Sequence, residues 1–387
     1  MSQLNYLEKL LDGVDVEWIA LREVVKTVTA PAKLKRESYR ETGKTPIIDQ
    51  GEKFITGYTD EDVKALPLGE YVIFGDHSEH IKYVDFSFIQ GADGLKILKS
   101  ISDNPKYVYY SFLNFYKKEL NYKRHWASAS ETLIPIPCPD NPEKSLAIQA
   151  EIVRILDAFT AMTAELTAEL NLRKKQYNYY RDQLLSFEDG EFEWKTLEHL
   201  CTSISAGGDV PKNSSKGQTA PTDEYPYPIY ANATGEKALY GFTDDYKIDS
   251  DAVTISARGA KVGYHTVREA KFTPIIRLIV LIANKNIVST RYLNYVLDMT
   301  PIGGTEAGIP QLTVPMVKKL TVPIPFPNDP KKSLFEQARI VSILDKFDTL
   351  TTSIQEGLPR EIELRQKQYE YYRDLLLSFP QPKEVVA

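Results

Sequence analysis

The sequence has little of what metal sites, disulfide frameworks and membrane spans require. Only two of the 387 residues are cysteines, Cys138 and Cys201, and they are too far apart to form a thiolate motif. The five histidines are scattered, and His77 and His80, although spaced like metal ligands, have no further ligand nearby. No apolar run approaches the roughly 18 residues of a membrane span, and the N-terminal stretch has no signal-peptide h-region or cleavage site. We therefore expect a cytoplasmic location.

Catalytic motifs are also missing. The sequence contains no Walker loop, HExxH, CxxC or GxSxG pattern. We therefore expect a chain that is not an enzyme and binds neither a metal nor a cofactor. Its hydrophobic content of 42% and charged content of 26% are ordinary for a globular protein. The net charge of −6 is unfavourable for a phosphate-bearing partner, but the acidic surplus falls in the repeated blocks and termini, and local charge matters more than total charge.

A long repeat dominates the sequence. Residues 133–187 begin LIPIPCPDNP and end QYNYYRDQLLSF, and residues 321–379 begin TVPIPFPNDP and end QYEYYRDLLLSF. The offset between the copies is 188 residues at Pro135 and Pro323, and 192 at the closing tyrosines, so the second copy has extra residues in its middle. A repeat this long does not arise by chance and governs the organisation of the chain.

Each copy predicts an extended Pro-rich segment followed by a helix. We expect Ser145 and Ser333 to cap the two helices. Apolar residues then recur at spacings of three and four, which predicts a helix-to-helix seam: Ile148, Ile152, Ile155, Phe159, Met162, Leu166 and Leu170, then Ile340, Ile343, Phe347, Leu350, Ile354 and Leu358. The first copy lacks Pro and Gly after Ser145, so about 40 helical residues would span roughly 60 Å. The second contains Gly357-Leu358-Pro359, where we expect a kink or a break.

The chain begins with a weaker echo of the repeat. Val16-Glu17-Trp18 resembles Phe192-Glu193-Trp194, so the N-terminus reads as the tail of another copy and should lie beside the C-terminal end. The sequence thus predicts an α+β protein in which two globular, mixed α/β domains are joined by two long antiparallel helices in a pseudo-two-fold circular arrangement. The expected segments are an N-terminal segment completing the repeat (1–25), domain 1 (26–132), helical spacer 1 (133–188), domain 2 (189–320), and helical spacer 2 with the tail (321–387).

The two globular domains share a predicted skeleton. Short β-like runs such as YVIFGD and DAVTISA precede one helix in each, over residues 104–120 and 290–299. The run PIIRLIVLIA reads as one strand of domain 2. Gly57-Tyr58-Thr59-Asp60 parallels Gly241-Phe242-Thr243-Asp244, whereas the polar loops hardly match. One scaffold with two loop sets indicates one task performed on two different targets.

Two polar stretches of each domain are candidates for contacts with nucleic acid. Cations neutralise phosphates, Arg and Lys read guanine edges, and aromatic rings pack on sugars. The domain 1 candidates are Lys33, Lys35, Arg36, Tyr39, Arg40, Lys44, Lys123, Arg124 and Trp126. Those of domain 2 are Lys212, Ser214, Lys216, Arg258, Lys261, Arg268 and Gln311. For each single residue an ordinary solvated loop is the favoured interpretation, and only the sets favour DNA.

The closing helices carry paired tyrosines at i, i+3. Tyr177 with Tyr180, and Tyr369 with Tyr372, lie on one helical face. Helix packing within the chain and docking of a partner subunit both explain them.

The whole pattern resembles the specificity subunit of type I restriction–modification systems. The resemblance rests on SLAIQAEIVRILDAF, KSLFEQARIVSILDKF and the two YYRD-containing endings. The tandem TAEL of residues 163–170 is similar to the type IC branch. The resemblance implies a protein that binds double-stranded DNA and reads a split, asymmetric site. It also implies that two modification (methyltransferase) subunits bind to the chain and methylate adenine N6 with S-adenosylmethionine. It also implies restriction subunits that use ATP and Mg²⁺.

Two further expectations follow. The resemblance also implies that the long helices set the length of the unread DNA spacer between the two half-sites. One extra TAEL copy adds about one helical turn, roughly 6 Å, and should lengthen this spacer by about one base pair. The rival hypothesis is a two-armed coiled-coil adaptor whose globular ends bind proteins.

Overall fold

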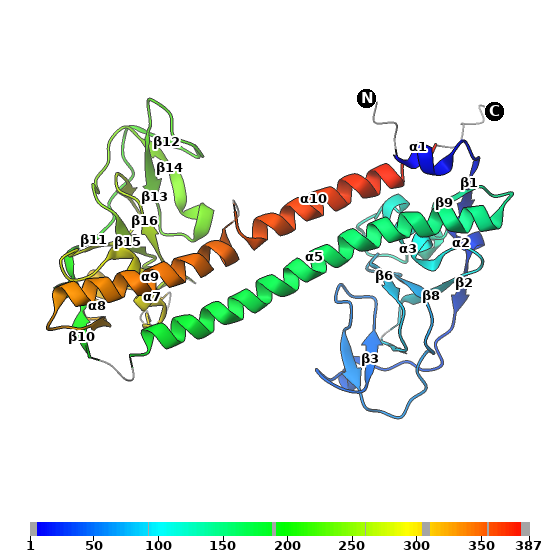
Figure 1. The fold of residues 1–387 in the computed structure, drawn as a ribbon, viewed down its shortest axis with the longest axis horizontal. Helices are drawn as coiled ribbons and strands as arrows, with labels where there is room; N and C mark the ends of the chain where they lie inside the picture. Colours follow the sequence, from blue (N-terminus) through cyan, green and yellow to red (C-terminus); the bar gives the residue numbers. More distant parts are fainter. Residues whose placement is uncertain are drawn as a thin grey trace. The chain divides into compact units, whose positions relative to one another are not determined.

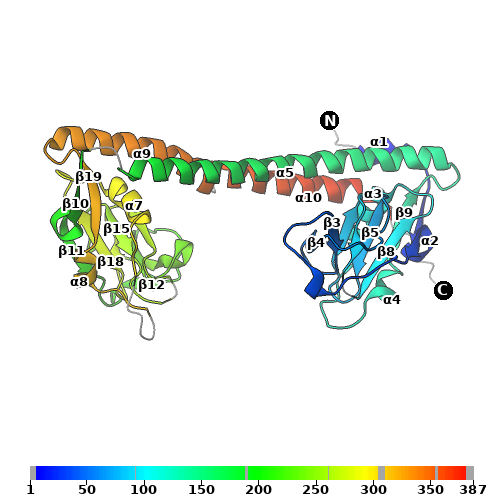
Figure 2. The ribbon, with the colours of Figure 1, turned by 90° about the horizontal axis from the view of Figure 1, so that it is seen from below.

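The computed structural model describes residues 6–380 except 92, 188–190, 260, 304–309 and 354–355. The chain divides into two compact units: Met1–Thr167 with Glu361–Ala387 (unit 1), and Ala168–Arg360 (unit 2). Figure 1 labels their elements, and Figure 2 shows that the strands of each unit lie on one side of the long helices. Within the described part of the chain, no helix is long and apolar enough to cross a membrane.

Unit 1 contains three small sheets, ordered β1-β9, β2-β8-β5-β6 and β4-β3-β7. Its elements before the long helices are α1 (Tyr6–Leu11), β1 (Val16–Ala20), α2 (Leu21–Val24), β2 (Val25–Val28), η1 (Arg36–Ser38), β3 (Thr45–Ile48), β4 (Gly57–Thr59), β5 (Tyr71–Gly75), β6 (Ile81–Val84), β7 (Ile89–Gln90), β8 (Leu95–Ser100), α3 (Pro105–Phe115), α4 (Trp126–Ala129) and β9 (Leu133–Pro137).

Unit 2 repeats this topology with one added strand, β12, in sheets β10-β19, β11-β18-β15-β16 and β12-β14-β13-β17. Its elements are β10 (Phe192–Thr196), α6 (Leu197–Leu200), β11 (Cys201–Ala206), β12 (Ser214–Lys216), β13 (Tyr227–Tyr230), η2 (Gly235–Ala238), β14 (Leu239–Thr243), β15 (Ala252–Ile255), β16 (His265–Arg268), β17 (Thr273–Pro274), β18 (Ile279–Ala283), α7 (Thr290–Asp298), α8 (Val314–Lys318) and β19 (Thr321–Pro325). The predicted shared skeleton is confirmed.

Strand register gives a residue-by-residue correspondence between the units. Val72 pairs with Tyr83 and Leu98. Val253 pairs in the same way with Val267 and Leu281. Counting outward from these pairs identifies the equivalent turn residues of the two units.

The first repeated block forms one continuous helix, α5 (Pro142–Leu185, 44 residues), whereas the second forms α9 (Pro330–Thr352) and α10 (Leu358–Leu376). The break expected near Gly357 is confirmed. A Cβ at this glycine would collide with the carbonyl oxygen of Thr349. Pro359 lies in the first turn of α10, where its missing N–H costs nothing.

The predicted caps Ser145 and Ser333 are wrong. The helices start earlier, where Asn141 Oδ1 accepts from Lys144 N and Asp329 accepts from Lys332 N. Both serines lie inside the first turns because the preceding Pro-containing segments already adopt helical geometry. Their hydroxyls accept hydrogen bonds from buried glutamines one turn later, Gln149 and Gln337.

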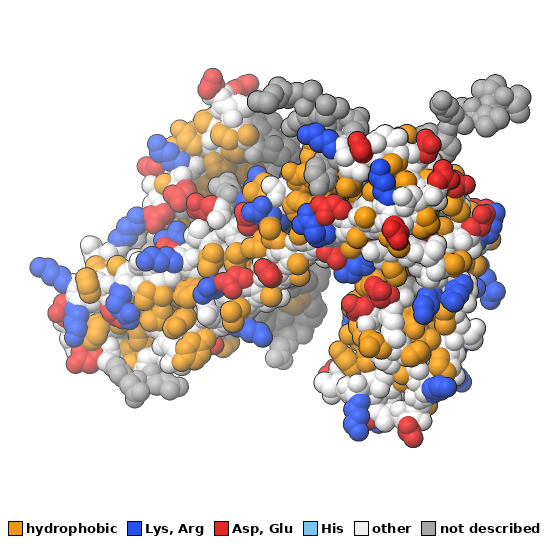
Figure 3. Space-filling view, turned by 45° about the vertical axis from the view of Figure 1, so that its right-hand side comes forward, with side chains coloured by type: hydrophobic (Ala, Val, Ile, Leu, Met, Phe, Trp, Pro, Cys, Tyr) orange, Lys and Arg blue, Asp and Glu red, His pale blue; other side chains and the backbone are white. Residues whose placement is uncertain are grey.

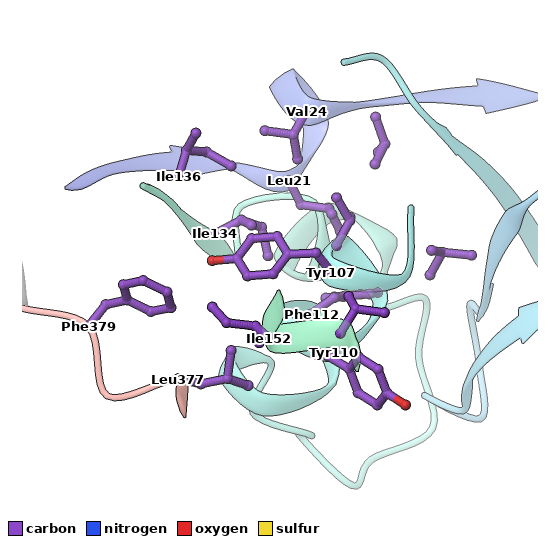
Figure 4. Packing of buried hydrophobic residues seen from close by; sticks show 14 of the residues in the cluster. Leu21, Val24, Tyr107, Tyr110, Phe112, Ile134, Ile136, Ile152, Leu377 and Phe379 are labelled. Atoms are coloured by element: carbon purple, nitrogen blue, oxygen red, sulfur yellow. The ribbon is translucent and has the colours of Figure 1, made fainter. Parts of the chain in front are cut away.

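The core of unit 1 joins the start of α5 to the end of α10, α3 and the β1-β9 pair (Figure 4). Tyr107 is fully buried there and donates to the carbonyl oxygen of Pro135 at 2.6 Å. In unit 2, Tyr292 donates to Pro323 at 2.9 Å. Ile148 and Ile152 lie in this globular core, so the expected helix-to-helix seam begins further along α5.

The long helices pack antiparallel within each unit. In unit 1 the rings of Phe159 and Tyr372 stack 5.0 Å apart, at 20° between their planes. In unit 2 the equivalent pair, Tyr180 and Phe347, stacks at 5.5 Å and 27°. The same aromatic contact therefore recurs with the roles of the two helical segments exchanged.

The start of the chain lies beside its C-terminal helix, as expected from the N-terminal echo. Trp18 Nε1 donates to the carbonyl oxygen of Pro380 at 2.7 Å. Leu11 belongs to the same core as Leu377 and Phe379.

Two element predictions were wrong. The helix expected over 104–120 ends at Phe115, because the next residues turn to hydrogen-bond the buried carboxylate of Glu79. The run PIIRLIVLIA forms two strands, β17 and β18, separated by a tight turn at Ile276 and Arg277.

Candidate nucleic-acid interface

In unit 1, three turns and one loop segment meet, and unit 2 has turns and a loop segment at the equivalent positions. In each unit we call this set of residues the three-turn surface. In unit 1 its residues are Gln50 after β3, His77 after β5, Asp93 and Gly94 before β8, and Tyr122, Lys123 and Arg124 before α4. By register, the equivalent residues of unit 2 are Asn232, Arg258, Ile276 and Arg277, and Pro310 and Gln311.

An amide side chain holds the turns of unit 1 together. Gln50 Nε2 donates to the carbonyl oxygen of Asp93, and its Oε1 accepts from His77 N, both at 3.1 Å. A Cβ at Gly94, whose φ is +90°, would lie 3.0 Å from this amide and from His77. Glycine fits this position because the backbone is left-handed and the neighbours approach closely.

The cations predicted in two separate stretches of domain 1 converge on this surface. Lys33 Nζ lies 2.9 Å from Asp93 Oδ1. The hydrogen bond and charge of Lys33, helped by the charge of Arg124, lower the pKa of Asp93. Two distant loops therefore place positive charge around one exposed turn.

An exposed aromatic ring belongs to the same surface. The side chain of Tyr122 is 92% exposed, yet its ring stacks on His77 at 5.6 Å and 21°. His77 Nδ1 lies 3.1 Å from the carbonyl oxygen of Lys123, which fixes the imidazole against the loop. A stacked ring flanked by cations suits contact with a sugar or base.

The loop that carries Tyr122 rests on a buried carboxylate. Glu79 accepts hydrogen bonds from the hydroxyl of Tyr116 and the amides of Glu119 and Leu120. Burial by itself would raise the pKa of Glu79, but these hydrogen bonds outweigh it and the pKa is lowered. The loop is thus built as one hydrogen-bonded unit.

Asn232 plays the role of Gln50 in unit 2. Its Oδ1 accepts from Arg258 N at 3.3 Å, and its Nδ2 donates to the carbonyl oxygen of Arg258 at 2.9 Å. Arg258 takes the place of His77 and pairs along the backbone with Gln311. Since Leu312 N donates to Ala257 as His125 N donates to Asp76, Gln311 corresponds to Arg124.

The structure therefore sorts the predicted candidates. Lys123, Arg124, Arg258 and Gln311 belong to the three-turn surfaces, and Lys33 pairs with Asp93 of the unit 1 surface. The others stay exposed on neighbouring loops and on β12: Lys35, Arg36, Arg40, Lys44, Lys212, Lys216 and Lys261, with half-buried Ser214.

Three candidates have internal packing roles that argue against DNA contact. Trp126 packs against the unit 1 core, 6.1 Å from the ring of Phe74. The guanidinium of Arg268 lies 3.9 Å from the centre of the Tyr230 ring. Tyr39 packs beside a small buried cluster of unit 1.

Sequence reasoning missed the amides and the stacked histidine. A signal was present, because Gln50 and Asn232 each lie four residues after the proline of a Pro-Ile strand, Pro46 and Pro228. Neither amide belongs to a basic stretch, so a search for charge overlooked both.

The paired tyrosines pack within the chain and also remain accessible. Tyr372 and Tyr180 are 39% and 45% exposed despite their stacking contacts. Tyr177 and Tyr369 are half-buried beside the unit cores. The more exposed rings are Tyr179 and Tyr371, at 61% and 58%, and neither belongs to the i, i+3 pairs.

The described residues hold no group of three His, Cys, Asp or Glu that could bind a metal. On the face drawn in Figure 3, basic side chains are interspersed with acidic ones. Positive charge is local, as at the three-turn surfaces.

Two stretches, residues 13–173 and 190–364, match the family described as type I restriction modification DNA specificity domain. The chain belongs to this family. It is a DNA specificity subunit, the non-catalytic part of a type I restriction–modification system.

Two named relatives match all or most of the chain. The EcoR124I/EcoR124II type I restriction enzyme specificity subunit of Escherichia coli is 44% identical, with 100% of both chains covered. The EcoprrI specificity subunit of Escherichia coli is 33% identical over 92% of this chain and 93% of the relative. The fold is similar to the crystal structure of a type I restriction–modification S subunit from M. genitalium, with a TM-score of 0.63, 15% identity, and 96% and 98% of the two chains covered.

Proposed function

We propose that this specificity subunit reads a split, asymmetric DNA site, with the three-turn surface of each unit reading one half. One observation carries the proposal: two units of the same topology place predicted DNA-contact residues at equivalent turns. Arg124 of unit 1 corresponds to Gln311 of unit 2, and His77 corresponds to Arg258. Because the reading side chains differ, the two half-sites differ.

The division of labour within the surface follows from its hydrogen bonds. The side-chain amides of Gln50 and Asn232 form hydrogen bonds to backbone groups of the protein, so they position the turns. The side chains of Arg124, Arg258 and Gln311 are the groups offered to DNA. Arg pairs with guanine edges and Gln with adenine edges in the major groove.

The catalytic steps belong to partner chains. Two modification subunits carry S-adenosylmethionine and methylate adenine N6, and restriction subunits supply ATP- and Mg²⁺-dependent translocation and cleavage in the bacterial cytoplasm. We propose that the modification subunits dock along the long helices at the exposed aromatic pairs, Tyr179 with Tyr180 and Tyr371 with Tyr372. Exposed aromatic rings are enriched at such interfaces.

Binding of duplex DNA at two salt concentrations tests the proposal. The subunit is measured alone and with its modification partner, against specific and scrambled duplexes. We expect specific binding by the assembled complex that weakens as salt rises, because phosphate contacts release counterions. Absent or salt-insensitive binding by the complex would favour the protein-binding adaptor.

A further inference from the structure

One turn of the three-turn surface has opposite chemistry in the two units. The turn before β8 contains Asp93 and Gly94, and the equivalent turn before β18 contains Ile276 and Arg277. Gly94 adopts φ +90° and Arg277 adopts φ +61°. Both turns therefore need a left-handed residue, but only unit 1 supplies the glycine that adopts it freely.

The turn of unit 2 is strained. Ile276 has φ +51°, which is an outlier for a β-branched residue, and it precedes Arg277 in the same left-handed region. Tight packing holds the turn, because Ile276 N donates to Gly208 O at 3.0 Å and a Cβ at Gly207 would lie 2.7 Å from the backbone of Pro274. Strain of this kind persists where function needs the conformation.

The turn presents its side chains to solvent instead of packing them. Ile276 is 53% exposed and Arg277 is also exposed. Among the described residues, no ion pair or hydrogen bond engages the guanidinium. No contact among the described residues therefore explains why an arginine occupies this strained position.

Charge at this turn is reversed between the units. In unit 1 the turn carries an acid, Asp93, neutralised by Lys33 and influenced by Arg124. In unit 2 the equivalent of Lys33 is Gly207, since Gly208 N bonds Pro274 O as Leu34 N bonds Gln90 O. Arg277 thus provides the positive charge that the neighbouring loops provide in unit 1.

We propose that Arg277 is a specificity-determining residue of unit 2, whose guanidinium reads a guanine edge in the second half-site. At the equivalent turn position unit 1 has Gly94, so the arginine side chain is not part of the framework that the two units share. A rigid turn also positions the planar guanidinium for two parallel hydrogen bonds to a guanine edge. The ammonium group of a lysine cannot form this bidentate pair. The inference rests on the proposed DNA-reading function of the three-turn surface.

The test compares Arg277→Gly with Lys271→Gly in the complex with the modification subunit. Lys271 is the control, because it is an exposed cation of unit 2 with φ +67° whose ammonium already lies over the ring of Tyr246, 5.8 Å from its centre. Both substitutions remove one positive charge and one left-handed non-glycine residue. Both should leave the Tm unchanged or raise it, since glycine relieves the strain.

Only Arg277→Gly should weaken specific DNA binding, by about tenfold to a hundredfold, and relax one base position of the second half-site. Arg277→Lys should fail to restore that base preference. The inference is overturned if Arg277→Gly leaves the recognised sequence intact, if Lys271→Gly alters it equally, or if lysine restores it. Failure of the unsubstituted complex to bind DNA would instead refute the proposed function.

Discussion

Glu79 is the residue on which the exposed Tyr122 loop depends. Its side chain is 4% exposed and lies 3.7 Å from the ring of His125, which is itself fully buried. An unfolded glutamate titrates near 4.5, and in the folded chain the pKa of Glu79 lies lower. Stabilisation by this carboxylate is therefore complete above about pH 4.5 and is lost as the pH falls through the folded value.

We predict that Glu79→Gln destabilises unit 1 by about 1–3 kcal/mol, because a neutral amide cannot satisfy three donors as a carboxylate does. The substitution should also flatten the dependence of unfolding free energy on pH below 4.5. Urea unfolding at a series of pH values measures both effects. An unchanged acid dependence would show that the carboxylate does not hold the loop.

Buried hydroxyls predict a second residue-scale effect. Tyr292 donates to the buried carbonyl of Pro323, and Tyr107 does the same for Pro135. Replacing either by Phe leaves a carbonyl without its donor, so we expect a loss of roughly 1–2 kcal/mol. Tyr179→Phe, at a 61% exposed position, is the control and should change stability by less than about 0.5 kcal/mol. Equal effects at all three positions in urea unfolding would contradict the assignment.

At the residue scale, polar residues of the three-turn surfaces could be predicted from the sequence, whereas the backbone conformation that positions Arg277 could not. Arg124, Arg258 and Gln311 were predicted and belong to the three-turn surfaces. Arg277 was missed because it lies inside an apolar run that reads as a strand. Its importance depends on backbone conformation and on register, which only the folded chain reveals.

At the scale of elements, the repeat made the helices predictable. The continuity of α5 and the break near Gly357 follow from where Pro and Gly occur. The starts at Ser145 and Ser333 were wrong, because Asn141 and Asp329 provide competing caps, each four residues earlier. Short strands such as β12 were not predicted, since pairing with β14 rather than local propensity defines them.

The TAEL repeat gives an element-scale prediction. Inserting one copy after Leu170 adds four residues to α5, about 6 Å of helix, and rotates the apolar face by only about 40°. We expect the unread DNA spacer to lengthen by about one base pair while both half-sites stay unchanged. Mapping of methylated adenines in cells expressing the insertion variant measures this. An unchanged spacer would contradict the role of α5 as a ruler.

At the scale of the whole molecule, duplication explains why two readers coexist in one chain. The topology, buried tyrosines and stacked aromatic pairs recur in both units, so the framework is shared. The turn side chains differ, so under the proposed function the recognised sequence changes without a change in the framework. The repeated blocks predicted this organisation, whereas the equivalence of the turns emerged only from strand register.

The most direct measurement maps methylated adenines in cells that co-express the modification subunit with one of three chains: unsubstituted, His77→Ala/Arg124→Ala, or Arg258→Ala/Gln311→Ala. The first double variant should relax only one half-site, and the second only the other, with the spacer unchanged in both. If either variant alters both half-sites, or if neither alters the recognised sequence, the three-turn surfaces are not the two readers.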